Sequence, residues 1–171
     1  MQDALADYRI SGSSETDGSR PLRDCLGHFA TGVAVVTTLD EAGGWVGLTV
    51  NSFTSVSLDP PLILWCLERS SDSRQLFTKD RTFAVNVLAA DQLALARRFS
   101  DVMTDRFEGV ETMEGQVGLP LLAGAAAIFE CAVEEVHDGG DHIIILARVK
   151  RSLEKGGPAL MFHQGAFRKT D

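Results

Sequence analysis

The apolar residues of this chain fall in short, β-branched runs that are separated by turn-forming residues. Runs of this length and composition are typical of strands, and the Gly, Pro and Asp between them mark turns. The expected strands cover residues 33–39, 45–50, 62–67, 82–88, 126–136, 143–149 and 160–167, with a polar extended stretch at 51–57. Strands in this number, mostly antiparallel, favour a closed or nearly closed barrel, because closure leaves no edge strand exposed.

Few helices are expected between these strands. Pro21 suits the first turn of a helix, and the apolar residues after it follow helical spacing until Gly32. Residues 70–79 and 91–99 predict two further short helices, while 101–124 shows no clear period and predicts loops with at most one turn of helix.

The length of 171 residues suits one domain with an extension. Residues 1–20 are rich in turn formers and hold little to bury, which favours a flexible N-terminal leader. We expect residues 21–171 to form the barrel domain.

Charge and composition exclude several classes of partner. The formal net charge is -8 and no stripe of Lys or Arg is present, so nucleic acid is not expected to bind.

No stretch approaches the roughly 20 apolar residues of a membrane helix, and the polar N-terminus shows no signal peptide. We therefore expect a cytoplasmic protein without membrane contact. Three well-separated cysteines without a CxxC pair argue against a disulfide framework or a thiolate zinc site.

A polar segment between two apolar strands is the first candidate for a binding site. It carries hydroxyl and amide side chains at Thr49, Asn51, Ser52, Thr54, Ser55 and Ser57. Buried without partners, such groups would each cost about 1–3 kcal/mol, so a polar ring system or a phosphate would satisfy them. An edge strand that hydrogen-bonds to water explains the pattern equally well.

The start of the helix expected at 70–79 is the second candidate. Free N–H groups at a helix N-terminus attract anions, and Arg69 and Arg74 lie close by. Simple capping of the helix by Ser71 or Asp72 is the plainer interpretation, and both can hold at once.

The third candidate is a turn at 137–142 that holds two histidines and two aspartates. A hairpin there would bring His137 and His142 near one another, as a metal site requires. Turns, however, collect Asp, Gly and His for their own conformational reasons, so we predict no metal. We expect a neutral His142 at the rim of a pocket, where an imidazole can hydrogen-bond or handle a proton beside a redox cofactor.

The motifs of the common nucleotide-binding and hydrolase folds are absent. The chain contains no GxGxxG, GxxxxGK[ST] or GxSxG. A Rossmann dinucleotide-binding domain is therefore not supported, and any nicotinamide would have to bind in another way.

Five motifs follow one another in order across almost the whole domain. They are LGHFATGVAVVT at 26–37, GLTVNSFTSVSLDPP at 47–61, FAVNVL at 83–88, GDH at 140–142 and LMFHQG at 160–165. Together they resemble the flavin reductase family with the FMN-binding split-barrel fold. The resemblance implies a closed antiparallel split β-barrel with a few short helices. It also implies a reductase that takes hydride from NADH or NADPH, reduces FMN or FAD and supplies reduced flavin to a flavin-dependent monooxygenase.

The resemblance further assigns residues to this site. The implied cofactor-binding residues are Thr49, Val50, Asn51, Ser52, Phe53, Ser55, Arg69, Ser70, Ser71, Arg74, Phe99 and Phe167. Residues 49–53 would line the flavin ring, while Arg69, Ser70, Ser71 and Arg74 would hold its phosphate. His142 would lie near the nicotinamide as the catalytic residue, and the flavin would lie at the interface of a homodimer. Many relatives carry Tyr in place of Phe167, so a hydroxyl contact is missing here.

Three other functions stay open at this point. The same barrel carries oxidases similar to pyridoxamine-phosphate oxidase, which hold flavin tightly and act on an organic substrate. It also carries flavin- or haem-binding proteins without turnover, and a barrel without any ligand is the plainest alternative.

Overall fold

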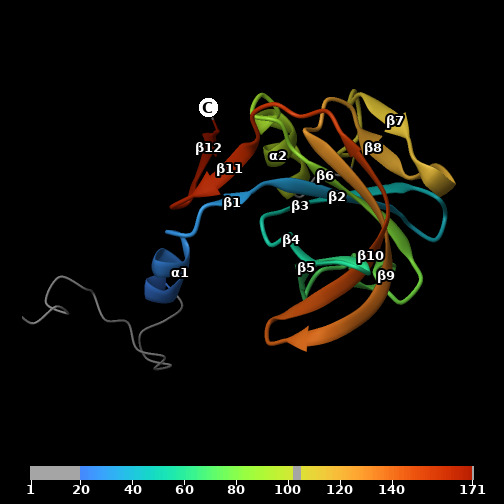
Figure 1. Ribbon diagram of the computed structural model, residues 1–171, viewed down its shortest axis with the longest axis horizontal. Helices are drawn as coiled ribbons and strands as arrows, with labels where there is room; N and C mark the ends of the chain where they lie inside the picture. The colour runs from blue at the N-terminus through green and yellow to red at the C-terminus, as the bar shows by residue number, and fades with distance from the viewer. Residues whose placement is uncertain (1–19, 102–104, 171) are drawn as a thin grey trace, which may run out of the picture.

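A seven-stranded antiparallel sheet curls into a barrel and forms the body of the protein (Figure 1). The computed structural model describes residues 20–101 and 105–170. The barrel strands are β2 Ala34–Leu39, β3 Trp45–Val50, β4 Thr54–Leu58, β5 Pro61–Glu68, β6 Thr82–Val87, β9 Ala127–Gly139 and β10 His142–Glu154. They follow the order β3-β2-β6-β9-β10-β5-β4 across the sheet. The mainly β, antiparallel architecture predicted from the sequence is confirmed.

The barrel is split between β3 and β4, which are consecutive in the chain but lie at opposite edges of the sheet. Residues 51–53 carry the chain from one edge to the other, and we call them the junction. The Ser52 hydroxyl accepts a hydrogen bond from the Cys66 N–H at 2.9 Å and donates to the Cys66 carbonyl oxygen at 3.2 Å. The Ser52 side chain thereby ties the junction to β5, where the described chain has no pairing of β3 with β4.

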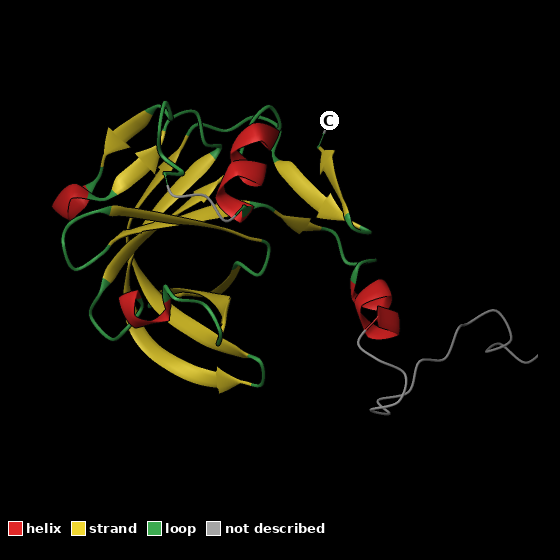
Figure 2. Ribbon diagram, turned by 180° about the vertical axis from the view of Figure 1, so that it is seen from behind, coloured by secondary structure: helices red, strands yellow, loops and turns green. Residues whose placement is uncertain are grey.

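Smaller elements surround the barrel. They are the helices α1 Arg20–Leu26 and α2 Leu93–Ser100, the 3-10 turns η1 Arg74–Leu76 and η2 Gln116–Gly118, and the strands β1 Thr31–Gly32, β7 Thr112–Glu114, β8 Pro120–Leu122, β11 Leu160–His163 and β12 Ala166–Lys169. Strands β1, β11 and β12 form a second sheet, and β7 pairs with β8. Helix α2 packs against β3, whereas α1 stands apart from the barrel (Figures 1 and 2).

The barrel interior holds the largest apolar core. Trp65, Phe77 and Phe83 meet edge to face there, with ring centroids 4.8 to 5.9 Å apart. Alternation along β5 explains the pattern, since Ile63, Trp65 and Leu67 point inward and are buried. A second cluster packs outside the barrel between β2, α2 and β11, and a third lies beneath the β7–β8 hairpin.

Four details differ from the sequence-based expectation. The helix predicted at 70–79 is wrong, because only the three-residue turn η1 forms there. Residues 101–124 were expected as loops but include the β7–β8 hairpin, and the strand expected at 160–167 is a hairpin of β11 and β12. Helix α1 ends at Leu26, well before Gly32.

The expected leader at 1–20 lies outside the described residues, apart from Arg20. Within residues 20–101 and 105–170, no helix is long and apolar enough to span a membrane.

Candidate active site

A cavity of about 310 Å³ lies beside the junction, and we call it the junction cavity. Its lining residues come from the end of β3, the junction, the end of β5 and the start of β10: Leu48, Thr49, Val50, Asn51, Ser52, Cys66, Leu67, Glu68, Ser71 and His142. The structure thus brings predicted ring-lining residues together with Ser71 and the predicted catalytic His142. These segments are distant in sequence, and β-sheet pairing unites them, since His142 pairs with Glu68.

The junction, whose residues Asn51 and Ser52 line this cavity, carries backbone N–H groups without a protein partner. Within the described chain, the N–H groups of Asn51, Ser52 and Phe53 donate to no protein acceptor. Backbone donors rarely stay unpaired away from water, so a ligand with acceptor atoms is a natural partner for them. The side chains of neighbouring residues are already engaged, since the Thr49 hydroxyl donates to the Ala96 carbonyl at 2.8 Å.

His142 is oriented by the residue before it. Its Nδ1 lies 2.7 Å from Oδ1 of Asp141, and the hydrogen bond from His142 lowers the pKa of the Asp141 carboxyl. An ionised carboxylate only accepts hydrogen bonds, so Nδ1 carries the hydrogen. In a neutral imidazole Nε2 is then an acceptor, and no described residue bonds to it.

Arg69, predicted to bind phosphate, contacts the β9–β10 turn instead. Its Nε donates to the Gly140 carbonyl at 2.9 Å, and its Nη2 lies 2.8 Å from Asp138 Oδ1. Its backbone N–H donates to the Asp141 carbonyl at 2.9 Å. The guanidinium is thus committed to the turn that precedes His142.

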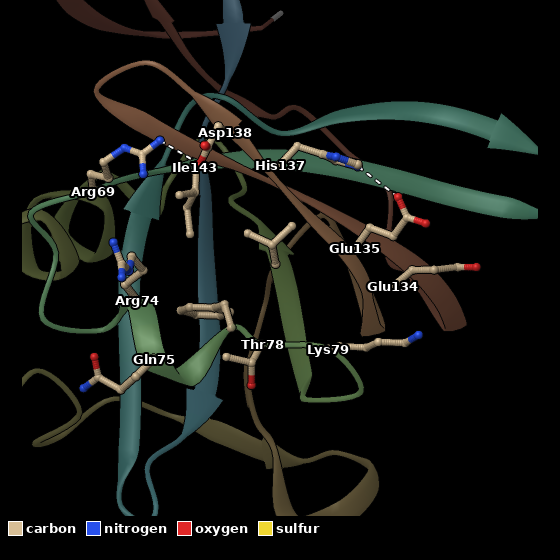
Figure 3. Close-up of a pocket in the computed structure, with 12 residues that line it drawn as sticks. Arg69, Arg74, Gln75, Thr78, Lys79, Glu134, Glu135, His137, Asp138 and Ile143 are labelled. Carbon is tan, nitrogen blue, oxygen red and sulfur yellow. Dashed lines mark hydrogen bonds and ion pairs between the residues drawn. The ribbon is translucent and has the colours of Figure 1, made fainter.

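A second cavity, of about 800 Å³, is lined by residues of the β9–β10 hairpin and of the segment after β5, and we call it the hairpin cavity (Figure 3). Arg69, Arg74 and Lys79 line it together with the acidic residues Glu134, Glu135 and Asp138. Figure 3 shows Arg69 paired with Asp138, and His137 paired with Glu135 at 3.1 Å. The predicted phosphate-binding segment is therefore divided, because Ser71 lines the junction cavity while Arg69 and Arg74 line the hairpin cavity.

Five predicted cofactor ligands lie outside both cavities, namely Phe53, Ser55, Ser70, Phe99 and Phe167, and Phe167 lines a smaller hollow beside the junction. Phe99 is 1% exposed and packs against Gly47 and Phe107, so α2 buries its ring behind β3. Phe53 points toward the barrel core and contacts Phe129 at a centroid distance of 5.5 Å. Ser55 is exposed on β4, and the Ser70 hydroxyl lies 3.4 Å from Glu68 Oε2.

Two further hollows adjoin the junction. One of about 210 Å³ brings Phe167 and Phe162 against Thr49, Val50 and Asn51. The other, of about 990 Å³, lies between the junction and the α1 segment, and we call it the arm cavity. Asn51 lines both of these hollows and the junction cavity, so the three spaces meet at the junction.

Four residues that line the junction cavity were not predicted from the sequence: Leu48, Cys66, Leu67 and Glu68. Residues 62–67 were read as one buried strand, but Cys66 and Glu68 lie on the face of β5 opposite the buried Trp65 and Leu67. The period-two alternation of a strand was the available signal. Partial burial raises the pKa of the Cys66 thiol, which keeps this wall of the cavity neutral.

The site fits a flat, hydrogen-bonding ring better than a metal ion. The junction cavity combines free backbone N–H groups with apolar walls from Leu48, Val50 and Leu67. Among the residues that the structure describes, no group of three His, Cys, Asp or Glu side chains is placed to hold a metal. His137 and His142 line different cavities.

Comparison with known proteins gives one consistent match. The family model of the flavin reductase like domain matches residues 26–171. The FMN reductase (NADH) SmoA of Agrobacterium fabrum is 43% identical over 151 residues, which are 88% of this chain and 86% of that protein. The reductase subunit HsaB of a flavin-dependent monooxygenase of Rhodococcus jostii is 38% identical over 98% of this chain and 85% of its own length.

One relative is longer, and one solved structure holds ligands. A probable flavin reductase of Rhizobium meliloti is 43% identical over 91% of this chain, which spans 50% of that protein. The NADH:FAD oxidoreductase SgcE6 of Streptomyces globisporus, in complex with NAD and FAD fragments, has a TM-score of 0.84 and 39% identity. The match covers 94% of this chain and 98% of that one. This chain belongs to the family of flavin reductase-like domains.

Proposed function

We propose that this chain is an NADH:flavin oxidoreductase that reduces FMN or FAD and supplies the reduced flavin to a separate flavin-dependent monooxygenase. The observation that carries the proposal is the junction cavity of this flavin reductase-like domain, which His142 lines together with Asn51 and Ser52, whose N–H groups have no acceptor among the described residues. The names of the relatives support NADH as donor and a monooxygenase as recipient.

NADH and the flavin would supply the redox chemistry, and the protein would position them. When both are bound, NADH would supply a hydride from nicotinamide C4 to flavin N5, and a proton from solvent would complete the reduced flavin and leave NAD⁺. The protein must bring the two atoms to about 3–3.5 Å and exclude other geometries.

The residues of the junction cavity have separate tasks in this scheme. The N–H groups of Asn51 and Ser52 donate to the polar edge of the flavin ring, where negative charge develops during reduction. Phe167 packs beside the ring from the adjoining hollow. His142, held by Asp141, hydrogen-bonds through Nε2 and orients the nicotinamide.

Ser71 and Arg74 are the proposed phosphate contacts. Ser71 closes one end of the junction cavity, and Arg74 lines the neighbouring hairpin cavity. No ion pair involves Arg74 within the described residues, so its guanidinium is available to an anion. Arg69, in contrast, is occupied by Asp138 and Gly140.

The working protein is proposed to be a homodimer that completes this site. Helix α1 has seven residues and buries none of them, and its Leu22 and Leu26, with Phe29 just after it, are 60% to 78% exposed. A helix this short is not stable in water by itself, so its apolar side chains need a covering surface. A second copy covering the α1 segment would also enclose the arm cavity, which opens onto the junction.

A turnover assay tests the proposed function. Pure protein is mixed with NADH and an excess of FMN, FAD or riboflavin, and NADH absorbance is followed over time. Steady oxidation of many equivalents of NADH per protein is expected. Oxidation of only one equivalent of NADH per protein, or of none, contradicts the proposal. It points to an oxidase that holds flavin tightly or to a flavin-binding protein without turnover.

A further inference from the structure

Three hydrogen bonds join one residue, Arg69, to the turn immediately before His142. Its Nε contacts the Gly140 carbonyl at 2.9 Å, its Nη2 contacts Asp138 at 2.8 Å, and its backbone N–H contacts the Asp141 carbonyl at 2.9 Å. Because these acceptors lie on both sides of the β9–β10 turn, with Asp138 near the end of β9 and Gly140 and Asp141 in the turn itself, Arg69 joins the turn to the end of β5.

The ladder pairing of His142 with Gly139 and Glu68 holds the base of this turn, whereas its side chains are mostly open to solvent. Asp138 and Asp141 have side chains that are 86% and 94% exposed, and Gly140 adopts a φ of 78° in the left-handed region. Hairpin tips of this kind are among the most mobile parts of a fold. His142 is the first residue of β10 after this tip, so movement of the turn displaces its imidazole.

The position of Arg69 in the chain makes the connection direct. Glu68 ends β5 and pairs with His142, and Arg69 is the next residue. From there its side chain reaches across the turn toward Asp138 on β9, as Figure 3 shows.

We propose that Arg69 is a positioning residue that keeps His142 in the junction cavity, and that it does not hold the flavin phosphate. This inference rests on the proposed function, in which His142 orients the nicotinamide. The carboxylate of Asp138 already neutralises the Arg69 guanidinium, which leaves Arg74 and Lys79 as the cations of the hairpin cavity without an ion-pair partner among the described residues.

The geometry requires arginine in particular. One planar guanidinium reaches a carbonyl through Nε and a carboxylate through Nη2 at the same time, whereas a lysine ammonium is a single point on a flexible chain. An exposed ion pair contributes little to folding, so variants of Arg69 are expected to fold.

The test compares Arg69→Ala, Arg69→Lys and His142→Ala with the double variant Arg69→Ala/His142→Ala. We expect Arg69→Ala to lower kcat about tenfold, as a misplaced reacting group does, while the Kd values of FMN and riboflavin change less than about twofold. Arg69→Lys should not restore kcat, and the double variant should match His142→Ala alone. Lys150→Ala, at an exposed position further along β10, serves as the control and should behave as wild type.

Two results overturn the inference. The first is a selective loss of FMN affinity over riboflavin that Arg69→Lys restores, since that identifies a phosphate contact. The second is an equal fall in kcat on mutating Arg69 with or without His142, since that removes the coupling between the two residues.

A measurement without turnover separates this inference from the proposed function. Hydrogen exchange of the peptide spanning 136–143 should be about tenfold faster in Arg69→Ala than in wild type, because the turn opens more often. Unchanged exchange rejects the positioning role even if the protein reduces flavin. Absent NADH oxidation in wild type, with faster exchange in the variant, rejects the function and keeps the structural role.

Discussion

Asn51 is the residue at which the three hollows around the junction meet. The residues around it differ in which of their hydrogen-bonding atoms have no protein partner. The Thr49 and Ser52 hydroxyls hydrogen-bond to the backbone of Ala96 and Cys66. Only the backbone of Thr49 and Ser52 is therefore left to contact a ligand. His142 is the reverse case, since Asp141 occupies Nδ1 and leaves Nε2 for a ligand.

Replacing His142 should separate catalysis from binding. We expect His142→Ala to lower kcat for NADH oxidation about tenfold to a hundredfold, because the nicotinamide loses an orienting contact. The Kd of the flavin, from a fluorescence titration, should change less than threefold, an estimate of roughly 0.6 kcal/mol. His137→Ala is the matched control, because His137 lies on the same hairpin but lines the hairpin cavity. A larger loss of flavin affinity than of kcat would refute the role of His142.

Replacing Arg74 should separate flavins by their phosphate. Arg74→Ala is expected to weaken FMN about tenfold, the size of one charge-assisted hydrogen bond, and to leave riboflavin unchanged because riboflavin has no phosphate. Isothermal titration of both flavins to the variant measures the difference. Equal losses for FMN and riboflavin would remove Arg74 from the phosphate site.

At the scale of elements, α2 supports the strand that carries the site. The Phe99 ring packs onto Gly47, and the Thr49 hydroxyl bonds to the Ala96 carbonyl, so two contacts join α2 to β3. A Cβ atom at Gly47 would lie 2.5 Å from the Phe99 ring, closer than real contacts allow. Phe99 therefore contributes to the site through packing.

Gly47→Ala tests this support. The added methyl must displace Phe99, which we expect to cost about 1–3 kcal/mol of the free energy of unfolding, measured by urea denaturation. Flavin affinity should fall with it, because β3 shifts beneath Thr49 and Asn51. Gly32→Ala is the control, since a Cβ atom there meets nothing within 4 Å. Equal stability of the two variants would show that α2 is not tightly seated on β3.

The sequence predicted the barrel strands better than the connections between them. Strands such as β3 were foreseen at their observed bounds, because alternation and β-branched side chains are local signals. The helix expected at 70–79 failed because Ser71 bonds to its own turn, at 3.3 Å from the Ser73 N–H, and Phe77 is drawn into the barrel core. Division of the Arg69–Arg74 segment between two cavities depends on the β5–β10 pairing, which the sequence does not encode locally.

At the scale of the molecule, the split of the barrel brings Thr49, Val50, Asn51, Ser52, Ser71 and His142 together, while Arg69 and Arg74 line the hairpin cavity. Ser52 hydrogen-bonds to Cys66 on β5. Beside the junction, the arm cavity is lined by the α1 segment, and the smaller hollow is lined by Phe167. The exposed α1 segment suggests how a second copy would close the site.

Charges placed on the α1 segment should disrupt this assembly. We expect Leu26→Asp combined with Phe29→Asp to turn a dimer into a monomer in sedimentation velocity, because a buried unpaired charge is costly. Flavin affinity should fall as well, since the arm cavity opens. Val117→Asp, at a position that is 70% exposed on η2, is the matched control and should stay dimeric. A monomeric wild-type protein with full activity would contradict the homodimer.

The central claim is that a flavin ring binds at the junction with its polar edge on the backbone of Asn51 and Ser52. A crystal structure of the protein soaked or grown with FMN or FAD tests it most directly. We predict ring density in the junction cavity, in hydrogen-bond contact with those N–H groups and open toward His142. Ring density in the hairpin cavity among Arg74, Lys79 and Glu135, with the junction left free, would contradict the account.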